Sequence, residues 1–192
     1  MTLHATLPIH SNMKGCLLAD NGTVNYYLKA DDWTKKADGT ASALNGSDGQ
    51  VMVEIPAYYR KFETDGNTRR VKISQYPLTG FEAVPKMYVS AYEAALDRTN
   101  SKLTSLINTT TQYRGGNNTS AWDAAANSLL GKPATNISRT NFRTYARNRG
   151  ANWQMYFYEA HKTIFWFFII EIPAPNPPCL YPCAVNVVFT AA

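Results

Sequence analysis

The last forty residues of this chain restrict its fold more than any other part, because a long apolar run meets a cluster of prolines there. Residues 153–171 are the most hydrophobic stretch, and residues 164–170 are apolar without interruption. Apolar side chains recur at helical spacing at Trp153, Phe157, Ala160, Ile164 and Phe168. This spacing favours a helix, although an uninterrupted apolar run also fits a buried strand. We expect a helix that turns into strand near its end and lies at the centre of the core.

The segment that follows cannot continue this helix. Five prolines fall within ten residues, at Pro173, Pro175, Pro177, Pro178 and Pro182. Because proline fixes φ and lacks a backbone donor, the segment allows only edge or irregular backbone. Such a segment has to be held by the scaffold beneath it. We therefore expect the framework to be complete at Glu171 and later side chains to project from a fixed surface.

Short strands and loops are expected in the earlier part of the chain. Alternating apolar residues predict strands over residues 24–28, 51–55, 57–63, 69–76 and 87–96. Residues 97–136 are rich in Asn, Thr, Ser and Gly, which predicts long irregular loops. The turn-rich residues 1–50 predict an N-terminal arm or a small β subdomain, and residues 51–192 predict the main domain.

Another helix is predicted from the N-cap residue Ser138 through Asn148, with Gly150 as its end. Four of the nine arginines cluster in it or just after it, at Arg139, Arg143, Arg147 and Arg149. The first three repeat at every fourth position and therefore share one face. They could face phosphates, but the rest of the chain has no extended basic patch. We interpret the four arginines as side chains that pin loops by pairing with carboxylates or carbonyls.

Motifs for catalysis or metal binding are not found in the sequence. His4, His10 and His161 have no metal-ligand spacing with Cys or carboxylates, and no glycine-rich nucleotide loop or nucleophile elbow occurs. Cys179 and Cys183 form the only pair that could carry redox or copper chemistry, and we interpret them as small apolar side chains. The sequence therefore predicts a protein without catalytic activity, cofactor or metal.

Charge and hydropathy limit the partners of the chain. Charged residues make up 17% of the sequence and the formal net charge is +5, which is low for a sequence-independent nucleic-acid binder. The longest apolar run has seven residues, too few to cross a bilayer, and the N-terminus lacks the basic and apolar regions of a signal peptide. We expect synthesis in the cytoplasm, no membrane insertion and no nucleic-acid partner.

Several strings, in this order and spacing, resemble the variable proteins of diversity-generating retroelements and related phage tail proteins of gut bacteria. They cover most of residues 16–171, and they are DNGTVNYYL at 20–28, KKADG at 35–39, GQVMVEIP at 49–56, YVSAYEA at 88–94, LGKP at 130–133, NISR at 136–139 and FRTYARNRG at 142–150. The resemblance implies an α+β chain with a C-type lectin fold of the formylglycine-generating-enzyme type. Such a fold has short antiparallel sheets, two helices and long irregular loops.

The resemblance also implies a ligand-binding role without catalysis, carried by a variable C-terminal segment at about residues 153–192. The framework beneath this segment is expected to include Glu93, Arg143, Arg147, Trp153 and Glu171. The ligand-binding surface is expected to include Tyr156, Tyr158, Ile172, Pro173, Pro175, Asn176, Pro177, Pro178, Cys179 and Tyr181.

In this family, errors at adenines turn AAC codons into codons that never encode Lys, Glu, Gln, Met or Trp. Residues 172–192 contain none of these five types, although they make up 29 of the 192 residues. At that frequency, 21 such positions in a row have a chance of roughly three in a hundred. Residues 172–178 also depart from the family, whose members continue past the glutamate with a string that contains Asn-Ser-Gln. The composition favours a diversified tail, and the departure leaves two explanations open: an unusual variant, or a tail that is altered relative to its relatives.

The function expected from these features is that of a display adhesin in a phage tail, or exported to a cell surface without a signal peptide. Its partner would be a protein or glycan receptor on a host or target cell. Two alternatives remain open at this point. One is a copper oxidase like the formylglycine-generating enzyme, which would use Cys179 and Cys183. The other is a structural virion component that uses residues 1–50 as an assembly arm.

Overall fold

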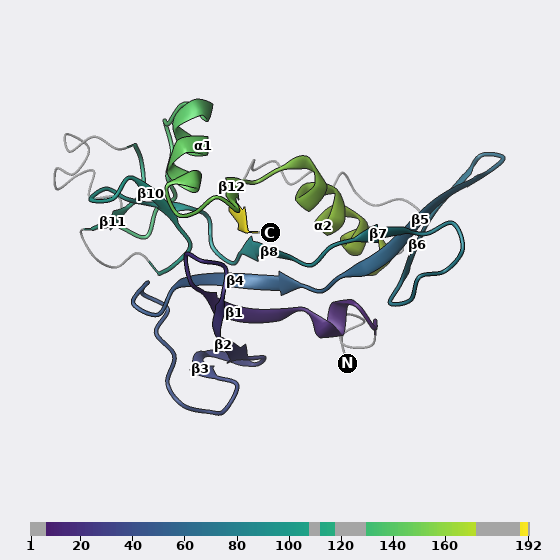
Figure 1. The fold of residues 1–192 in the computed structure, drawn as a ribbon, viewed down its shortest axis with the longest axis horizontal. Helices are drawn as coiled ribbons and strands as arrows, with labels where there is room; N and C mark the ends of the chain where they lie inside the picture. The colour runs from purple at the N-terminus through teal and green to yellow at the C-terminus, as the bar shows by residue number, and fades with distance from the viewer. Residues whose placement is uncertain (1–6, 108–111, 118–129, 172–188, 192) are drawn as a thin grey trace.

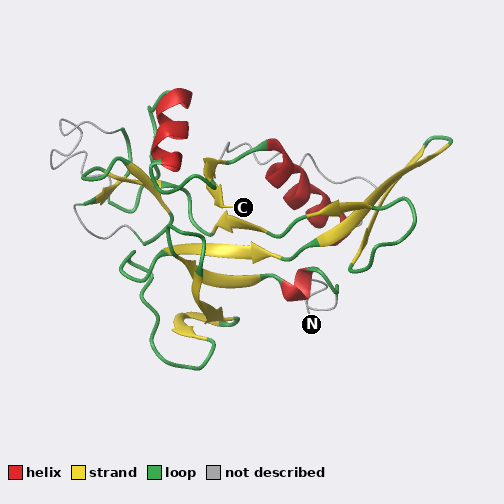
Figure 2. Cartoon of the chain, in the orientation of Figure 1, coloured by secondary structure: helices red, strands yellow, loops and turns green. Residues whose placement is uncertain are grey.

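The computed structural model of the protein describes residues 7–107, 112–117, 130–171 and 189–191. Residues 189–191 are described by their backbone alone. In these ranges the chain forms three antiparallel sheets and two α-helices (Figures 1 and 2), which confirms the predicted α+β class. No helix in the described ranges has the length and apolar character needed to cross a membrane.

The largest sheet holds seven strands, and every neighbouring pair in it is antiparallel. In spatial order its strands are β12 (Trp153–Met155), β13 (Phe189–Ala191), β8 (Met87–Ser90), β4 (Gln50–Ile55), β1 (Lys14–Leu18), β2 (Val24–Lys29) and β3 (Asp32–Lys36). This order shows that the two ends of the described chain contribute strands to the same sheet.

Two three-stranded sheets flank the large one. Their strands are β6 (Thr68–Ser74), β5 (Tyr58–Asp65) and β7 (Glu82–Val84) in one, and β10 (Lys102–Thr104), β9 (Ala95–Asp97) and β11 (Tyr113–Arg114) in the other. Helix α1 (Arg139–Arg147) lies beside the β10–β9–β11 sheet, and α2 (Tyr158–Glu171) lies toward β7 and β8 (Figure 1). A short 3-10 helix, η2 (His10–Asn12), precedes β1.

Four of the five predicted strands are confirmed, as β2, β4, β5 and β6. The fifth prediction, one strand over residues 87–96, is wrong, because β8 ends at Ser90 and β9 begins at Ala95 in a different sheet. Both strands are completely buried, so the apolar pattern runs through the point where the chain changes sheets. Glu93, which the sequence placed inside a strand, lies exposed in the connection.

The strands of the N-terminal segment are part of this large sheet. Strand β1 pairs with β4 along its whole length, from Lys14 opposite Glu54 to Leu18 opposite Gln50. The boundary drawn at residue 50 therefore falls within one sheet. Removing residues 1–50 would take away three of its seven strands, so such a deletion cannot serve as a test for an assembly arm.

Helix α1 matches its prediction closely. It begins after the N-cap Ser138, whose hydroxyl accepts a hydrogen bond from the Asn141 backbone N–H at 3.2 Å. Its C-cap is Asn148. Gly150 is needed for a different reason than helix termination, since a Cβ there would lie 2.8 Å from the Asp20 carbonyl oxygen. Close packing rather than a left-handed φ therefore explains this glycine.

We expect Ser138→Ala to lower the free energy of unfolding by about 1 kcal/mol, because one N-terminal backbone donor of α1 loses its acceptor. Urea denaturation followed by circular dichroism would measure the change. Ser138→Asp retains an acceptor at the cap and serves as the control, with stability close to that of the unmodified protein. Equal losses in both variants would contradict a role for the cap.

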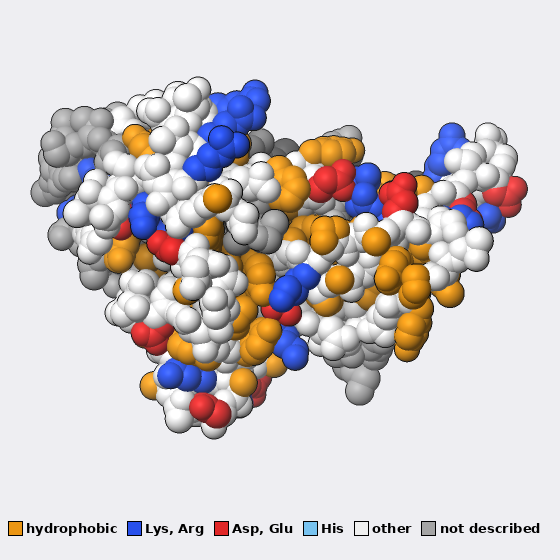
Figure 3. Space-filling view, viewed as in Figure 1, with side chains coloured by type: hydrophobic (Ala, Val, Ile, Leu, Met, Phe, Trp, Pro, Cys, Tyr) orange, Lys and Arg blue, Asp and Glu red, His pale blue; other side chains and the backbone are white. Residues whose placement is uncertain are grey.

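The C-terminal apolar run was predicted correctly only in part. The helix is confirmed over residues 158–171, but residues 153–155 form strand β12, and the helix does not turn into strand before its end at Glu171. Ala160, Thr163 and Phe167 are buried, whereas Ile164 is 39% exposed and Phe165 40% exposed. Hydrophobic side chains accordingly gather at the surface over α2 (Figure 3).

The expectation that the framework is complete at Glu171 is wrong. Strand β13 lies between β12 and β8, with Thr190 opposite both Gln154 and Val89. Strand β12 therefore joins the large sheet only through the last residues of the chain. The backbone of residues 189–191 therefore belongs to the framework, because the sheet is continuous only when it is in place.

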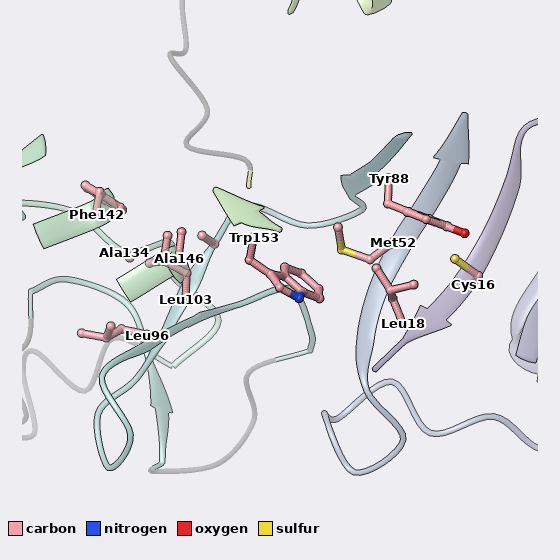
Figure 4. Packing of buried hydrophobic residues seen from close by; sticks show 11 residues of the cluster. Cys16, Leu18, Met52, Tyr88, Leu96, Leu103, Ala134, Phe142, Ala146 and Trp153 are labelled. Atoms are coloured by element: carbon pink, nitrogen blue, oxygen red, sulfur yellow. The ribbon is translucent and has the colours of Figure 1, made fainter. Parts of the chain in front are cut away.

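Trp153 lies at the centre of the main hydrophobic cluster and is 1% exposed. Figure 4 shows its indole between two groups of side chains. Cys16, Leu18, Met52 and Tyr88 come from the large sheet on one side. Leu96, Leu103, Ala134, Phe142 and Ala146 come from the β10–β9–β11 sheet, a loop and α1 on the other. This tryptophan joins the large sheet to α1 and the small sheet beside it.

Candidate functional site

A groove of about 500 Å³ separates α1 from the chain that runs from β12 into α2. Its lining combines the arginine face of the helix with the segment on the other side, and it consists of Arg139, Arg143, Arg147, Gln154, Met155, Tyr156, Phe157 and Tyr158. Basic side chains gather over α1 on the face shown in Figure 3. The groove thus brings together the arginine repeat and both described tyrosines of the predicted ligand-binding surface.

The three arginines of α1 are exposed, and their side chains form no hydrogen bond or ion pair within the part of the chain that the structure describes. The helix presents its apolar side, with Phe142 and Ala146, to the core, so the arginine face points away from it. Among the residues that the structure describes, no carboxylate lines the groove. The described lining is therefore positively charged and contains no counter-ion.

The two tyrosines have different surroundings. Tyr158 is 72% exposed, and the Lys162 ammonium lies 6.0 Å from its ring centroid. Tyr156 is half-buried, and its ring packs edge-to-face with the His161 ring, with the two ring centroids 6.0 Å apart. Burial raises the pKa of Tyr156, so its hydroxyl remains a neutral donor at physiological pH. One tyrosine is available to a ligand from most directions, and the other forms the wall of the groove.

The other predicted ligand-binding residues, Ile172, Pro173, Pro175, Asn176, Pro177, Pro178, Cys179 and Tyr181, lie outside the described residues. Of the predicted framework residues, the structure places Trp153 in the core and Glu171 half-buried at the end of α2. Glu93 lines an open cavity of about 570 Å³ beside Tyr92 and Leu106. Arg143 and Arg147 are exposed and line the groove, and their side chains form no hydrogen bond or ion pair among the described residues.

Loop pinning by arginine is observed at Arg149 instead. Its guanidinium is buried, its Nε–H donates to the Leu103 carbonyl oxygen at 2.9 Å, and its Nη1 pairs with the Asp20 carboxylate. Lys102 Nζ lies 2.9 Å from the same carboxylate, and the Trp153 indole N–H donates to the Asp20 carbonyl oxygen at 2.8 Å. The turn after β1 is thus tied to β10 and to the end of α1.

The interpretation of the arginines therefore holds for Arg149 and not for the three on the helix face. The four arginines look alike in the sequence because they are chemically identical and close together. The sequence signal that separates Arg149 from the others is its position outside the repeat of four. The strings at 20–28 and 142–150, both part of the family resemblance, meet at this point.

Cys16 lies on strand β1 of the large sheet, within the main hydrophobic cluster. Burial, with a smaller contribution from the Glu54 carboxylate, raises the pKa of its thiol to about 12. A thiol is a nucleophile only as the thiolate, so this cysteine is chemically inert in the folded protein. Cys179 and Cys183, on which the copper alternative depends, lie outside the described residues.

We expect Cys16, as the sole thiol of a Cys179→Ser/Cys183→Ser variant, to resist iodoacetamide at pH 8 and to react completely in denaturing urea. Above its ordinary pKa of 9.0 the unfolded chain loses this proton first, so the free energy of unfolding falls as the pH rises from 9.0 toward about 12. Mass spectrometry measures the labelling, and the further variant Cys16→Ala is the blank. Rapid labelling of the folded protein would contradict the buried position.

Among the described residues, no group of three or more His, Cys, Asp or Glu is arranged to hold a metal ion. His10 is buried, with Nε2 3.1 Å from the Phe167 carbonyl oxygen, and His161 is exposed on α2. The geometry therefore offers a charged, aromatic groove as the strongest candidate site. No protein-family model, curated protein or solved structure matches this chain.

Proposed function

We propose that this protein is a receptor-binding display protein that holds its partner in the groove between α1 and residues 154–158. One observation carries the proposal: three exposed arginines without partners among the described residues face two tyrosines across a cavity of about 500 Å³. Unpaired arginine and accessible tyrosine are the side chains most enriched at the energetic centres of protein interfaces.

The proposal includes a C-type lectin fold and retroelement diversification of the tail. Short antiparallel sheets, two helices and loop-rich connections support the fold assignment. Residues 153–155 and 189–191 are strands of the large sheet, so their backbone belongs to the framework of this proposed segment. We assign the diversified positions to Tyr156, Tyr158 and residues 172–181. A reverse transcriptase gene beside the coding sequence, with a near-copy of its last part that differs at adenines, is the expected genomic finding.

Binding to an array of cell-surface proteins and glycans tests the function directly. We expect the protein to bind at least one receptor, and Tyr158→Ser to weaken that binding about tenfold. Tyr76→Ser is the matched control, because Tyr76 is 68% exposed on the connection between β6 and β7, away from the groove. Both variants should retain the melting temperature of the unmodified protein. Equal binding by the two variants would contradict the proposed site.

A replacement of residues 173–181 by a Gly/Ser linker tests the contribution of the tail. We expect receptor binding to be lost while the melting temperature stays nearly unchanged, because diversified positions must not build the core. Differential scanning calorimetry and the same receptor assay measure the two properties. Unfolding of the linker variant would show that this segment stabilises the domain and would remove it from the proposed binding surface.

A further inference from the structure

We propose that the groove binds an extended acidic peptide segment of the receptor, whose carboxylates pair with Arg139, Arg143 and Arg147. The inference rests on the proposed receptor-binding function and names the chemistry of the partner. The charge of the groove, the spacing of its arginines and the strand in its other wall all fit such a segment.

The groove has the charge of an anion site. Its lining, as far as the structure describes it, contains three arginines and no carboxylate. The carboxylate next to it in sequence, Glu159, is already occupied, since Arg60 Nη2 donates to it at 2.9 Å and Lys162 Nζ lies 3.7 Å from it. Arginine pairs with carboxylates through two parallel hydrogen bonds, which favours a partner with several such groups.

The spacing of the arginines selects the conformation of that partner. With a rise of 1.5 Å per residue, positions four apart on α1 are separated by about 6 Å along the helix. In an extended chain, every second side chain points the same way at intervals of about 6.6 Å. Acidic residues at alternating positions therefore stay in register with all three arginines, because the accumulated mismatch of about 1 Å is within the reach of a flexible side chain.

The other wall of the groove also suits an extended segment. Strand β12 is the outermost strand of the seven-stranded sheet, and its Gln154 and Met155 line the groove. Extended peptides commonly bind along the edge of a sheet.

Fluorescence anisotropy with labelled peptides tests the inference on the intact protein at low salt. The probe is acetyl-Thr-Asp-Thr-Asp-Thr-Asp-Thr-amide. A peptide of the same composition with its three Asp adjacent has the same charge and the wrong spacing, and a third peptide has Asn in place of Asp. We expect the alternating probe to bind about tenfold more tightly than the clustered one and the Asn peptide not to bind.

Variants assign the binding to the groove. The triple variant Arg139→Gln/Arg143→Gln/Arg147→Gln should weaken the binding of the alternating probe by about tenfold or more. The control Arg69→Gln/Arg70→Gln/Lys72→Gln removes the same charge from exposed positions on β6 and should leave binding unchanged. Equal binding of the alternating and clustered peptides would overturn the inference, and so would tighter arginine-dependent binding of a sulfated oligosaccharide.

The two proposals fail in distinguishable ways. A receptor whose binding requires Tyr158 but is unchanged in the triple arginine variant would leave the receptor-binding function in place and overturn the acidic-peptide inference. A complete absence of receptors whose binding depends on Tyr158 would overturn the function itself.

Discussion

Trp153→Ala is expected to lower the free energy of unfolding by about 4 kcal/mol, the largest effect of any single substitution proposed for this protein. The indole is 1% exposed and lies between the large sheet and the elements around α1 (Figure 4). Its removal leaves a cavity that both groups of side chains line, so neither can close it alone. The Asp20 carbonyl oxygen also loses its donor at 2.8 Å. Urea denaturation, fitted for both midpoint and slope, measures the loss.

Two further variants separate burial from the hydrogen bond. Trp153→Phe keeps most of the apolar surface but lacks the indole N–H, and we expect a loss of about 2 kcal/mol. Trp166→Ala is the matched control for the size of the substitution, since Trp166 is only half-buried on α2, where its ring centroid lies 5.3 Å from that of Phe62. We expect it to cost less than half as much as Trp153→Ala. Similar losses at the two tryptophans would contradict the central position of Trp153.

Thr190→Pro should destabilise the protein by on the order of 2 to 3 kcal/mol, although the position lies within three residues of the end of the chain. Thr190 pairs with Val89 on one side and Gln154 on the other, so it belongs to a strand inside the sheet. Proline removes the backbone donor and has no place in a strand that is paired on both edges. Thermal unfolding followed by circular dichroism gives the change in stability.

Thr190→Val is the control for this prediction, because it keeps the backbone N–H and a β-branched side chain. Its stability should stay close to that of the unmodified protein. If Thr190→Pro were equally stable, β13 would not hold β12 in the sheet, and the framework would after all end at Glu171. The substitution thus tests the main correction that the structure makes to the sequence prediction.

Local patterns in the sequence were sufficient for several of the elements. Alternating apolar residues located β2, β4, β5 and β6, and Ser138 located the start of α1, because strand periodicity and helix capping depend on neighbours only a few residues apart. The candidate groove was partly foreseen in the same way. The repeat of four placed Arg139, Arg143 and Arg147 on one face, and the resemblance marked Tyr156 and Tyr158.

Pairing between distant residues was decided by the tertiary structure alone. Trp153 fits a helical spacing equally well, but its segment is a strand because β13, more than thirty residues later, pairs with it. The four arginines are chemically alike, and only the position of Asp20 makes Arg149 a pinning residue and leaves the other three to the groove. Periodicity in a sequence identifies which face of an element is apolar, whereas the partner of that face is set by contacts that no local pattern encodes.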